Sequence, residues 1–343
     1  MEETIQKLNP AEFLQRARSV PVIDVRAPKE FRQGHIPGAI SMPLFDDDER
    51  AIVGITYTRM GREEAVLKGL EIIGPRLPEI AGQGREYAKD GELLVHCWRG
   101  GMRSEAMAWL LQLSGIKTSV LAGGYRAYRH YIRESLSLGS PVIVLGGMTG
   151  SGKTELLQHL STLGEQVLDL EALANHKGSA FGSMGQPDQP TTEQFENDLA
   201  FQWLALDPKK PVWIEDESRN IGKVIIPEPL FNKMIGAPVV FIEVPFELRV
   251  KRLSEEYGSF ETSDLAELIR KISRRMGGDK ANEAIQALER GNIGEAVSIV
   301  LHYYDKSYQY GLSKREKNRM QMIKVENEDL HTIASKLQER ICN

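Results

Sequence analysis

Short apolar runs alternate with helical patterns through the first part of the chain. Apolar runs with strand propensity occupy residues 20–25, 93–95 and 119–121, and runs of this length are typical of buried strands. Between the last two, the apolar positions of residues 104–113 recur at helical spacing. Strands that alternate with helices indicate a parallel sheet with helices packed on it.

The same pattern is repeated in the second part. Strands are predicted at residues 142–145, 166–170, 211–214 and 239–244, and from about residue 246 the chain is predicted to be helical and polar to its end. Gly139 and Ser140 directly precede a proline, which favours a domain boundary there. The predicted fold is therefore α/β, with one parallel-sheet domain at 1–138 and a second at 139–343 that ends in a helical part.

Composition indicates the class of protein and the compartment to which these domains belong. The chain has 343 residues, of which 41% are hydrophobic and 27% charged, as in ordinary globular proteins. We find neither an apolar run of membrane-spanning length nor a signal peptide, so no membrane partner is expected. The two cysteines, Cys97 and Cys342, lie far apart in sequence, which argues against a disulfide framework and favours a reducing cytoplasm.

Bulk charge and local charge point in different directions. The net charge of −5 argues against nucleic acid as a partner. Two basic clusters could nevertheless clamp a phosphate backbone, although a solvated helix face is the more common explanation for either cluster taken alone. The first cluster is Arg270, Lys271, Arg274 and Arg275, and the second is Lys314, Arg315, Lys317 and Arg319.

A cysteine motif follows the strand predicted at 93–95. It reads His96-Cys97-Trp98-Arg99-Gly100-Gly101-Met102-Arg103-Ser104. The thiol of Cys97 would face a helix N-terminus, loop amides, Arg99 and Arg103, and such surroundings favour the reactive thiolate. The motif predicts a catalytic nucleophile, and the alternative is a buried structural cysteine.

A phosphate-binding motif lies about 40 residues further on. Its sequence is Gly147-Met148-Thr149-Gly150-Ser151-Gly152-Lys153-Thr154, between the strand at 142–145 and an apolar-periodic helix. This context predicts that the loop amides around Gly147, Gly150 and Gly152 wrap a phosphate chain, that Lys153 binds its charge and that Thr154 holds Mg²⁺. A diphosphate and a nucleoside triphosphate both fit this prediction.

Two further polar positions accompany this loop. Asp216 follows the strand at 211–214 and is the candidate second residue for Mg²⁺, with Glu215 as its competitor. A strand-end salt bridge is the alternative for this acidic segment. His176 could donate to a phosphate or orient a base, and it could equally be a structural hydrogen-bonding residue.

Both halves of the chain resemble known families. Residues 24–40, with Asp24-Val25-Arg26 and Gly34-His35-Ile36-Pro37-Gly38, resemble the rhodanese signature, and Leu121-Ala122-Gly123-Gly124-Tyr125 resembles its closing strand. Behind the rhodanese-like domain and the P-loop NTPase-like motif come the strings at 169–182, 194–197 and 215–222, and the segment 47–54 precedes the cysteine. Together they resemble the bacterial tRNA 2-selenouridine synthases over essentially the whole chain, except for residues 260–295, which we do not place against the family.

The resemblance implies a transferase that replaces sulfur by selenium at C2 of the wobble uridine of tRNA. It implies selenophosphate as selenium donor, with selenophosphate synthetase as a partner, and geranylation of 2-thiouridine from geranyl diphosphate as an intermediate step. S-alkylation turns the sulfur into a leaving group. The P-loop would then hold the diphosphate that leaves, and Cys97 would carry selenium as a perselenide stabilised by Arg103.

The cysteine loop departs from ordinary sulfurtransferases in one respect. Arg103 follows Cys97 by six positions, whereas the arginine of the common rhodanese loop follows by five. The spacing also fits cysteine phosphatases, although the sequence offers no marked general acid, and a loop enlarged for selenophosphate explains it equally well. A P-loop kinase with a regulatory rhodanese domain and a non-catalytic persulfide carrier are the remaining alternatives.

Overall fold

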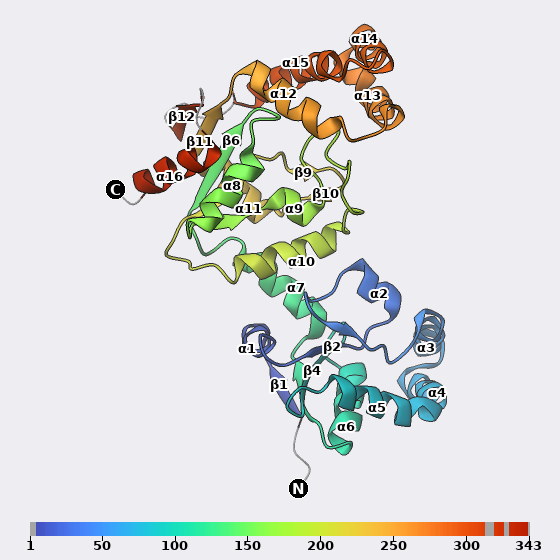
Figure 1. Cartoon of the computed structure of the whole chain (residues 1–343). Helices are drawn as coiled ribbons and strands as arrows, with labels where there is room; N and C mark the ends of the chain where they lie inside the picture. The colour runs from blue at the N-terminus through green and yellow to red at the C-terminus, as the bar shows by residue number, and fades with distance from the viewer. Residues whose placement is uncertain (1–4, 313–318, 326–328, 342–343) are drawn as a thin grey trace. The chain divides into compact units, whose positions relative to one another are not determined.

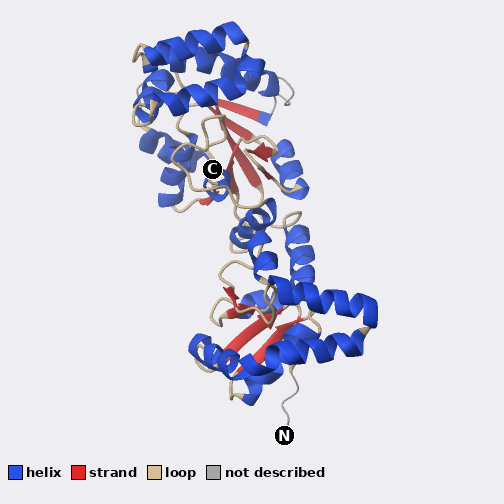
Figure 2. Cartoon of the chain, turned by 90° about the vertical axis from the view of Figure 1, so that its right-hand side faces the viewer, coloured by secondary structure: helices blue, strands red, loops and turns tan. Residues whose placement is uncertain are grey.

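The computed structural model describes residues 5–312, 319–325 and 329–341. The chain divides into two compact units (Figure 1). The first comprises Met1–Ser135 together with Glu196–Phe201, and the second comprises Leu136–Phe195 and Gln202–Asn343. In each unit a sheet is flanked by helices, as Figure 2 shows.

The first unit contains a five-stranded parallel sheet with the order β1-β5-β4-β2-β3. Every residue of β2 and most residues of β4 and β5 are buried. Helices cover both faces of the sheet and bury these strands. Strands buried on both sides need apolar residues at nearly every position. The strands are β1 (Gln6–Leu8), β2 (Val22–Asp24), β3 (Ile40–Ser41), β4 (Glu92–His96) and β5 (Lys117–Leu121).

Two helices of the first unit begin at residues whose side chains cap them. Asn9 and Asp46 each accept the backbone N–H three residues on, and a glutamate there reaches back to the cap. The helices are α1 (Pro10–Arg16), α2 (Pro28–Gln33), α3 (Asp47–Met60), α4 (Arg62–Ile73), α5 (Leu77–Tyr87), α6 (Met102–Leu113) and α7 (Gly124–Ser135), with a 3-10 turn at Gly74–Arg76.

The second unit has its own five-stranded parallel sheet with the order β12-β11-β6-β8-β7. The phosphate-binding motif follows β6, the central strand. The strands are β6 (Val142–Gly147), β7 (Gln166–Leu168), β8 (Val212–Glu215), β11 (Val239–Glu243) and β12 (Met320–Lys324), and a separate hairpin is formed by β9 (Asn220–Ile221) and β10 (Val224–Ile225).

Two hydrophobic cores stabilise the second unit. One lies where α8 and α16 pack beside the sheet, around Leu157 and Leu337. The other lies inside the helical part α12–α15 and includes Phe181 and Leu253. The helices are α8 (Lys153–Thr162), α9 (Leu170–Ala174), α11 (Glu228–Gly236), α12 (Phe246–Tyr257), α13 (Thr262–Met276), α14 (Gly278–Glu289), α15 (Ile293–Leu312) and α16 (Leu330–Ile341). The ends of α10 (Thr192–Trp203) also belong to this unit, whereas its middle, Glu196–Phe201, belongs to the first.

The predicted parallel α/β fold is confirmed, with one correction in its last part. The chain is not helical throughout after residue 246, because Met320–Lys324 forms the edge strand β12 beside β11. The strand escaped prediction because none of its residues is fully buried, so its apolar pattern is weak. Within the described ranges, we find no helix long and apolar enough to cross a membrane.

Candidate functional site

The loop that carries Cys97 connects β4 to α6. Gly100 has φ +66° and Gly124 has φ +63°. A Cβ atom at Gly124 would lie 2.4 Å from the Cys97 carbonyl oxygen and 2.4 Å from the Gly100 nitrogen. The Tyr125 N–H donates to the Cys97 carbonyl at 2.8 Å. Glycine is therefore required where the start of α7 closes on this loop.

The thiol of Cys97 lies at the N-terminal end of α6. Its residue is 3% exposed, and its Sγ is 3.2 Å from Ser104 Oγ. The same hydroxyl also lies 3.0 Å from the Gly101 carbonyl oxygen. The Ser104 hydroxyl donates to that carbonyl, and either atom of the Ser104–Cys97 pair can be the donor in the contact between them. The sulfur thus lies where the positive end of a twelve-residue helix favours a bound anion.

The two predicted arginines of this loop lie in different surroundings. Arg103 Nη1 donates to Glu30 Oε2 at 2.9 Å, and Arg99 is exposed. Burial raises the pKa of Glu30, but the hydrogen bond and charge of Arg103 outweigh it, so the pKa lies below its ordinary value. Arg103, the second residue of α6, is thus oriented by the carboxylate of Glu30.

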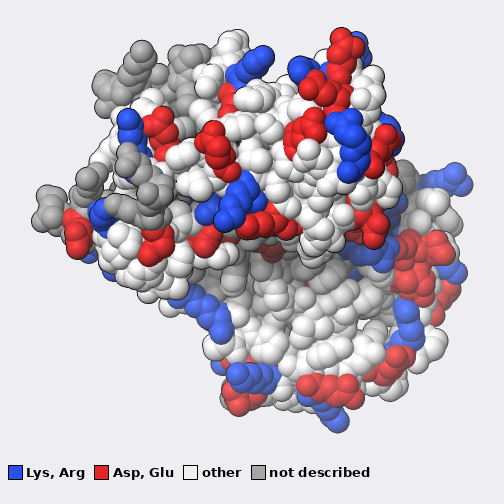
Figure 3. All heavy atoms as spheres, turned by 45° about the horizontal axis from the view of Figure 1, so that its top comes forward, with Lys and Arg blue, Asp and Glu red and all other residues white. Residues whose placement is uncertain are grey.

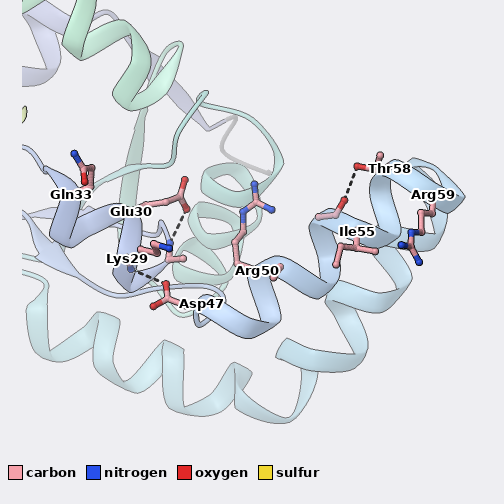
Figure 4. Close-up of a pocket in the computed structure, with 11 residues that line it drawn as sticks. Lys29, Glu30, Gln33, Asp47, Arg50, Ile55, Thr58 and Arg59 are labelled. Carbon is pink, nitrogen blue, oxygen red and sulfur yellow. Dashed lines mark hydrogen bonds between the residues drawn. The ribbon is translucent and has the colours of Figure 1, made fainter.

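A cavity of about 720 Å³ lies beside this ion pair, between α2 and α3 (Figure 4). Glu30 and Arg50 are among its lining residues. The pKa of Arg50 is lowered by burial and by the charge of Arg103, against the charge of Glu30. The Arg50 Nε atom is buried and has no hydrogen-bond partner among the described residues. The cavity wall therefore holds a guanidinium group that an anion would stabilise.

Beneath the loop, a buried ion pair supports the first unit. Asp24 and Arg26 are both fully buried, and Arg26 Nη2 lies 2.6 Å from Asp24 Oδ2. The Arg26 guanidinium stacks 3.7 Å above the Tyr125 ring. Burial lowers the pKa of His96 to about 4, so this histidine is neutral near pH 7. These residues support the loop, as expected for positions that identify a fold.

The phosphate loop connects β6 to α8. Gly150 and Gly152 have φ +80° and +81°, and a Cβ atom at Gly152 would lie 2.3 Å from Arg252 Nη1. Lys153 Nζ donates to the Gly147 carbonyl at 3.0 Å, so its side chain folds back across the loop. The strand, the glycine-rich loop and the helix N-terminus together form a cradle for phosphate groups.

The hydroxyl of Thr154 contacts a different carboxylate from the predicted one. Thr154 Oγ1 donates to Glu171 Oε2 at 3.0 Å, whereas Asp216 Oδ2 accepts the Tyr308 hydroxyl at 2.7 Å. That hydroxyl also accepts the Gly147 N–H at 3.1 Å. Asp216 is therefore connected to the loop through Tyr308.

The competitor of Asp216 is unsuited to a metal ion. Glu215 is fully buried, its Oε2 accepts the Leu170 N–H at 3.0 Å, and burial raises its pKa well above the ordinary value. Thr154 and Glu171 offer oxygen ligands of the kind that Mg²⁺ prefers. In the part of the chain that the structure describes, however, no three His, Cys, Asp or Glu side chains are arranged to hold a metal ion.

Two glutamates that were not predicted from the sequence, Glu171 and Glu217, line the cavity at this loop. A Cβ atom at Gly178 would lie 2.5 Å from Glu217 Oε1 and 2.9 Å from Glu171 Oε1, so the two carboxyl groups meet there. Burial and the Glu171 charge raise the pKa of Glu217 to about 8, although Lys153 opposes the shift. The raised pKa favours a proton on this pair of glutamates, so an anion in the loop meets fewer negative charges.

His176 also lies in this region. It is buried, and burial lowers its pKa, which favours the neutral imidazole. Its Nδ1 has no hydrogen-bond partner within the described ranges, and a Cβ atom at Gly182 would lie 2.7 Å from that atom. The structure thus places His176 at the phosphate cavity as an uncharged group.

The phosphate loop opens into a cavity of about 1,320 Å³. Gly147, Gly150, Gly152, Lys153, Thr154, Glu171, His176, Asp216 and Glu217 line one part of it. Apolar and aromatic side chains also line it: Phe181, Met184, Leu253, Tyr257, Phe260, Ile272, Tyr303 and Tyr304. Several of these residues come from α12, α13 and α15, so the segment 260–295 contributes to the cavity wall.

Comparison with known proteins covers both units. Residues 9–131 match the model of the rhodanese-like domain, and residues 140–261 match that of the tRNA 2-selenouridine synthase AAA domain. Three similar proteins are described as tRNA 2-selenouridine synthases. They come from Nitrosomonas europaea (33% identity, covering 87% of this chain and 90% of that protein), Bdellovibrio bacteriovorus (35%, 87% and 90%) and Serratia proteamaculans (36%, 88% and 89%).

The similarity therefore extends over the thiol loop of a rhodanese-like domain and the phosphate loop of a P-loop domain with a helical C-terminal part. With both loops formed in the structure, the chain belongs to the tRNA 2-selenouridine synthase family.

Proposed function

We propose that this chain replaces sulfur by selenium in the wobble 2-thiouridine of tRNA, in two steps at two sites. Its relatives are described as tRNA 2-selenouridine synthases. Two steps match two separate pieces of machinery, a phosphate cavity in the second unit and a thiol loop in the first. The first step alkylates the sulfur, and the second introduces selenium from selenophosphate.

The observation that carries the first step is the composition of the phosphate cavity. One part offers loop amides and Lys153, and the other offers a wall of aliphatic and aromatic side chains such as Phe181 and Phe260. Geranyl diphosphate has the matching construction, with a charged head and an apolar chain. Burial of that chain contributes roughly 25 cal/mol for each Å² of apolar surface removed from water.

The alkylation step needs no nucleotide, because the diphosphate of the geranyl donor is itself the leaving group. The sulfur of 2-thiouridine attacks C1 of the geranyl group, so that an S–C bond forms while the C–O bond to diphosphate breaks. The uridine loses its N3 proton to water and becomes neutral. Lys153 and the loop amides stabilise the charge of the leaving diphosphate. Mg²⁺ held at Thr154 and Glu171 would neutralise part of that charge when bound.

The second step takes place at the thiol loop. Selenium from selenophosphate replaces the geranylthio group at C2 of the uridine, and geranylthiol leaves. Cys97 is the nucleophile that acts on selenophosphate, because its sulfur lies at a helix N-terminus beside the Ser104 hydroxyl. Arg103 and the exposed Arg99 supply positive charge around the loop.

A reconstituted reaction tests this function. We expect the purified chain to convert 2-thiouridine tRNA into S-geranyl-2-thiouridine tRNA with geranyl diphosphate alone, and into 2-selenouridine tRNA once selenophosphate is added. Nucleoside mass spectrometry measures both products. Added ATP should leave the yields unchanged. An absolute requirement for ATP would instead support a P-loop kinase with a regulatory rhodanese domain.

We expect the tRNA to contact the basic cluster on α13. Arg270, Lys271, Arg274 and Arg275 are all exposed, and Arg275 also lines the phosphate cavity. On the face that Figure 3 shows, Lys and Arg are interspersed with Asp and Glu. Changing the four residues together to alanine should weaken binding of all tRNAs alike. The slope of log affinity against log salt should fall by about one unit for each tRNA phosphate that the variant no longer neutralises.

The second basic cluster is the comparison for this experiment. Lys314, Arg315 and Lys317 lie outside the described residues, and Arg319 is exposed and donates to the Gly236 carbonyl at 2.7 Å. Binding isotherms at several salt concentrations decide between the clusters. An unchanged slope in the α13 variant removes that cluster from the interface. Unchanged slopes in both variants would assign the tRNA interface to the surface near Arg99 and Arg126.

A further inference from the structure

The thiol loop has the residue spacing of cysteine phosphatases, whose loops hold a tetrahedral phosphate group. Cys97 and Arg103 are separated by five residues, and Arg103 is the second residue of α6. The next residue, Ser104, places its hydroxyl 3.2 Å from the Cys97 sulfur. A thiol, loop amides, a guanidinium group and a hydroxyl at one helix N-terminus are suited to an attack on phosphorus as well as on selenium.

Attack of the thiol on selenium changes oxidation states, whereas its attack on phosphorus does not. The selenium of selenophosphate is at the oxidation level of selenide, and it has the same level in 2-selenouridine. Formation of an S–Se bond at Cys97 would remove two electrons from sulfur and selenium, which requires an oxidant or the reduction of phosphorus. Release of selenium from that bond would then require a reductant. Attack on phosphorus requires neither.

We propose that Cys97 takes the phosphoryl group of selenophosphate and sets free its selenium as hydrogen selenide. This inference rests on the proposed function, in which selenophosphate is the donor. The S–P bond forms as the P–Se bond breaks, and both electrons of the broken bond leave with selenium. The hydrogen selenide ion attacks C2 of the S-geranylated uridine and expels geranylthiolate. Water then hydrolyses the S–P bond, which returns the thiol and yields phosphate.

This assignment explains why the loop lacks a proton donor for the leaving group. His96 beneath it is neutral, since burial holds its pKa near 4, and Glu30 is kept ionised by Arg103. An alcohol leaving from phosphorus needs a general acid. Hydrogen selenide is a much stronger acid than an alcohol and leaves as an anion at neutral pH. The loop can therefore transfer a phosphoryl group without that acid.

Neighbouring side chains can assist both steps, the transfer of the phosphoryl group to Cys97 and the hydrolysis of the S–P bond. Arg103, the second residue of α6, donates to Glu30 at 2.9 Å. Arg50 lines the cavity beside that ion pair, and its Nε has no hydrogen-bond partner among the described residues. Both arginines favour the highly charged selenophosphate anion. In the hydrolytic half, sulfur leaves as thiolate. The Ser104 hydroxyl donates to the Gly101 carbonyl at 3.0 Å and lies 3.2 Å from the sulfur, so it can turn to donate to the thiolate instead.

Selenophosphate labelled separately in phosphorus and in selenium tests the proposal. The full chain is mixed with it in the absence of tRNA, and the reaction is quenched within milliseconds. We expect labelled phosphorus on Cys97 and labelled selenide in solution, where an alkylating reagent traps it. The Ser104→Ala variant should accumulate at least about ten times more phosphorus label, because hydrolysis loses the hydrogen bond to the leaving sulfur. Cys97→Ser should retain none.

The outcomes separate this inference from the function on which it rests. Labelled selenium on Cys97, with phosphate released, would overturn the phosphoryl step. Absence of the phosphorus label from both the wild type and Ser104→Ala would overturn it as well. A parallel assay with S-geranylated tRNA reports selenation. If 2-selenouridine forms there while either contrary result holds, the phosphoryl step alone is wrong, whereas failure to form it would count against the proposed function.

Discussion

Replacing Cys97 by serine will leave S-geranyl-2-thiouridine accumulating in tRNA while 2-selenouridine disappears. The geranyl transfer uses the phosphate loop in the second unit, which the substitution does not alter. The hydroxyl of serine is a far weaker nucleophile than a thiolate at a helix N-terminus. Loss of a covalent nucleophile lowers a rate by on the order of 1,000-fold or more, and nucleoside mass spectrometry of bulk tRNA measures both species.

The other cysteine provides the matched control. Cys342→Ser removes a thiol outside the described residues and should leave both nucleosides at wild-type levels. Normal 2-selenouridine in the Cys97 variant would show that selenation needs no cysteine nucleophile. Loss of the geranylated species as well would show that the two sites do not act separately.

Lys153→Ala will suppress geranylation, and selenation of 2-thiouridine tRNA will fall with it. The Lys153 ammonium lies in the phosphate loop, where it contacts the Gly147 carbonyl at 3.0 Å. Its removal leaves the developing charge of diphosphate with loop amides only. Loss of one such stabilising group costs on the order of 100-fold in rate, which initial rates of geranylation with geranyl diphosphate will show.

Two comparisons make this result specific. Lys251→Ala removes an exposed lysine of α12 and should change neither rate. Pre-geranylated tRNA should restore selenation by the Lys153 variant, because the second step does not use the phosphate loop. Selenation of 2-thiouridine tRNA at the wild-type rate in that variant would refute the proposed role of the loop.

The sequence was sufficient to predict both loops because each is local. Residues 96–104 and 147–154 each connect a buried strand to a helix, and the structure has β4 to α6 and β6 to α8 at these places. Gly100, Gly150 and Gly152 adopt positive φ where neighbouring backbone or side chains approach closely. A strand–loop–helix unit is specified by its own residues, so the motif predicts its geometry.

The partners of these loops could not be predicted because they come from distant segments. Glu171 follows β7, Glu217 follows β8, and Tyr308 lies on α15. Their meeting at the phosphate loop depends on the strand order β6-β8-β7 and on the position of the helical part. The carboxyl ends of adjacent parallel strands form ligand sites, which would have favoured Glu171 and Glu217 once that order was known.

The Tyr308 hydroxyl connects the phosphate loop to α15, a helix that contributes aromatic residues to the cavity lining. It accepts the Gly147 N–H at 3.1 Å and donates to Asp216 at 2.7 Å, so α15 is fastened to the loop that holds the phosphate end of the cavity. Tyr303 and Tyr304 of the same helix also line that cavity. We therefore expect chain-length selectivity among allylic diphosphates to depend on the Tyr308 hydrogen bonds as well as on the size of the apolar lining residues.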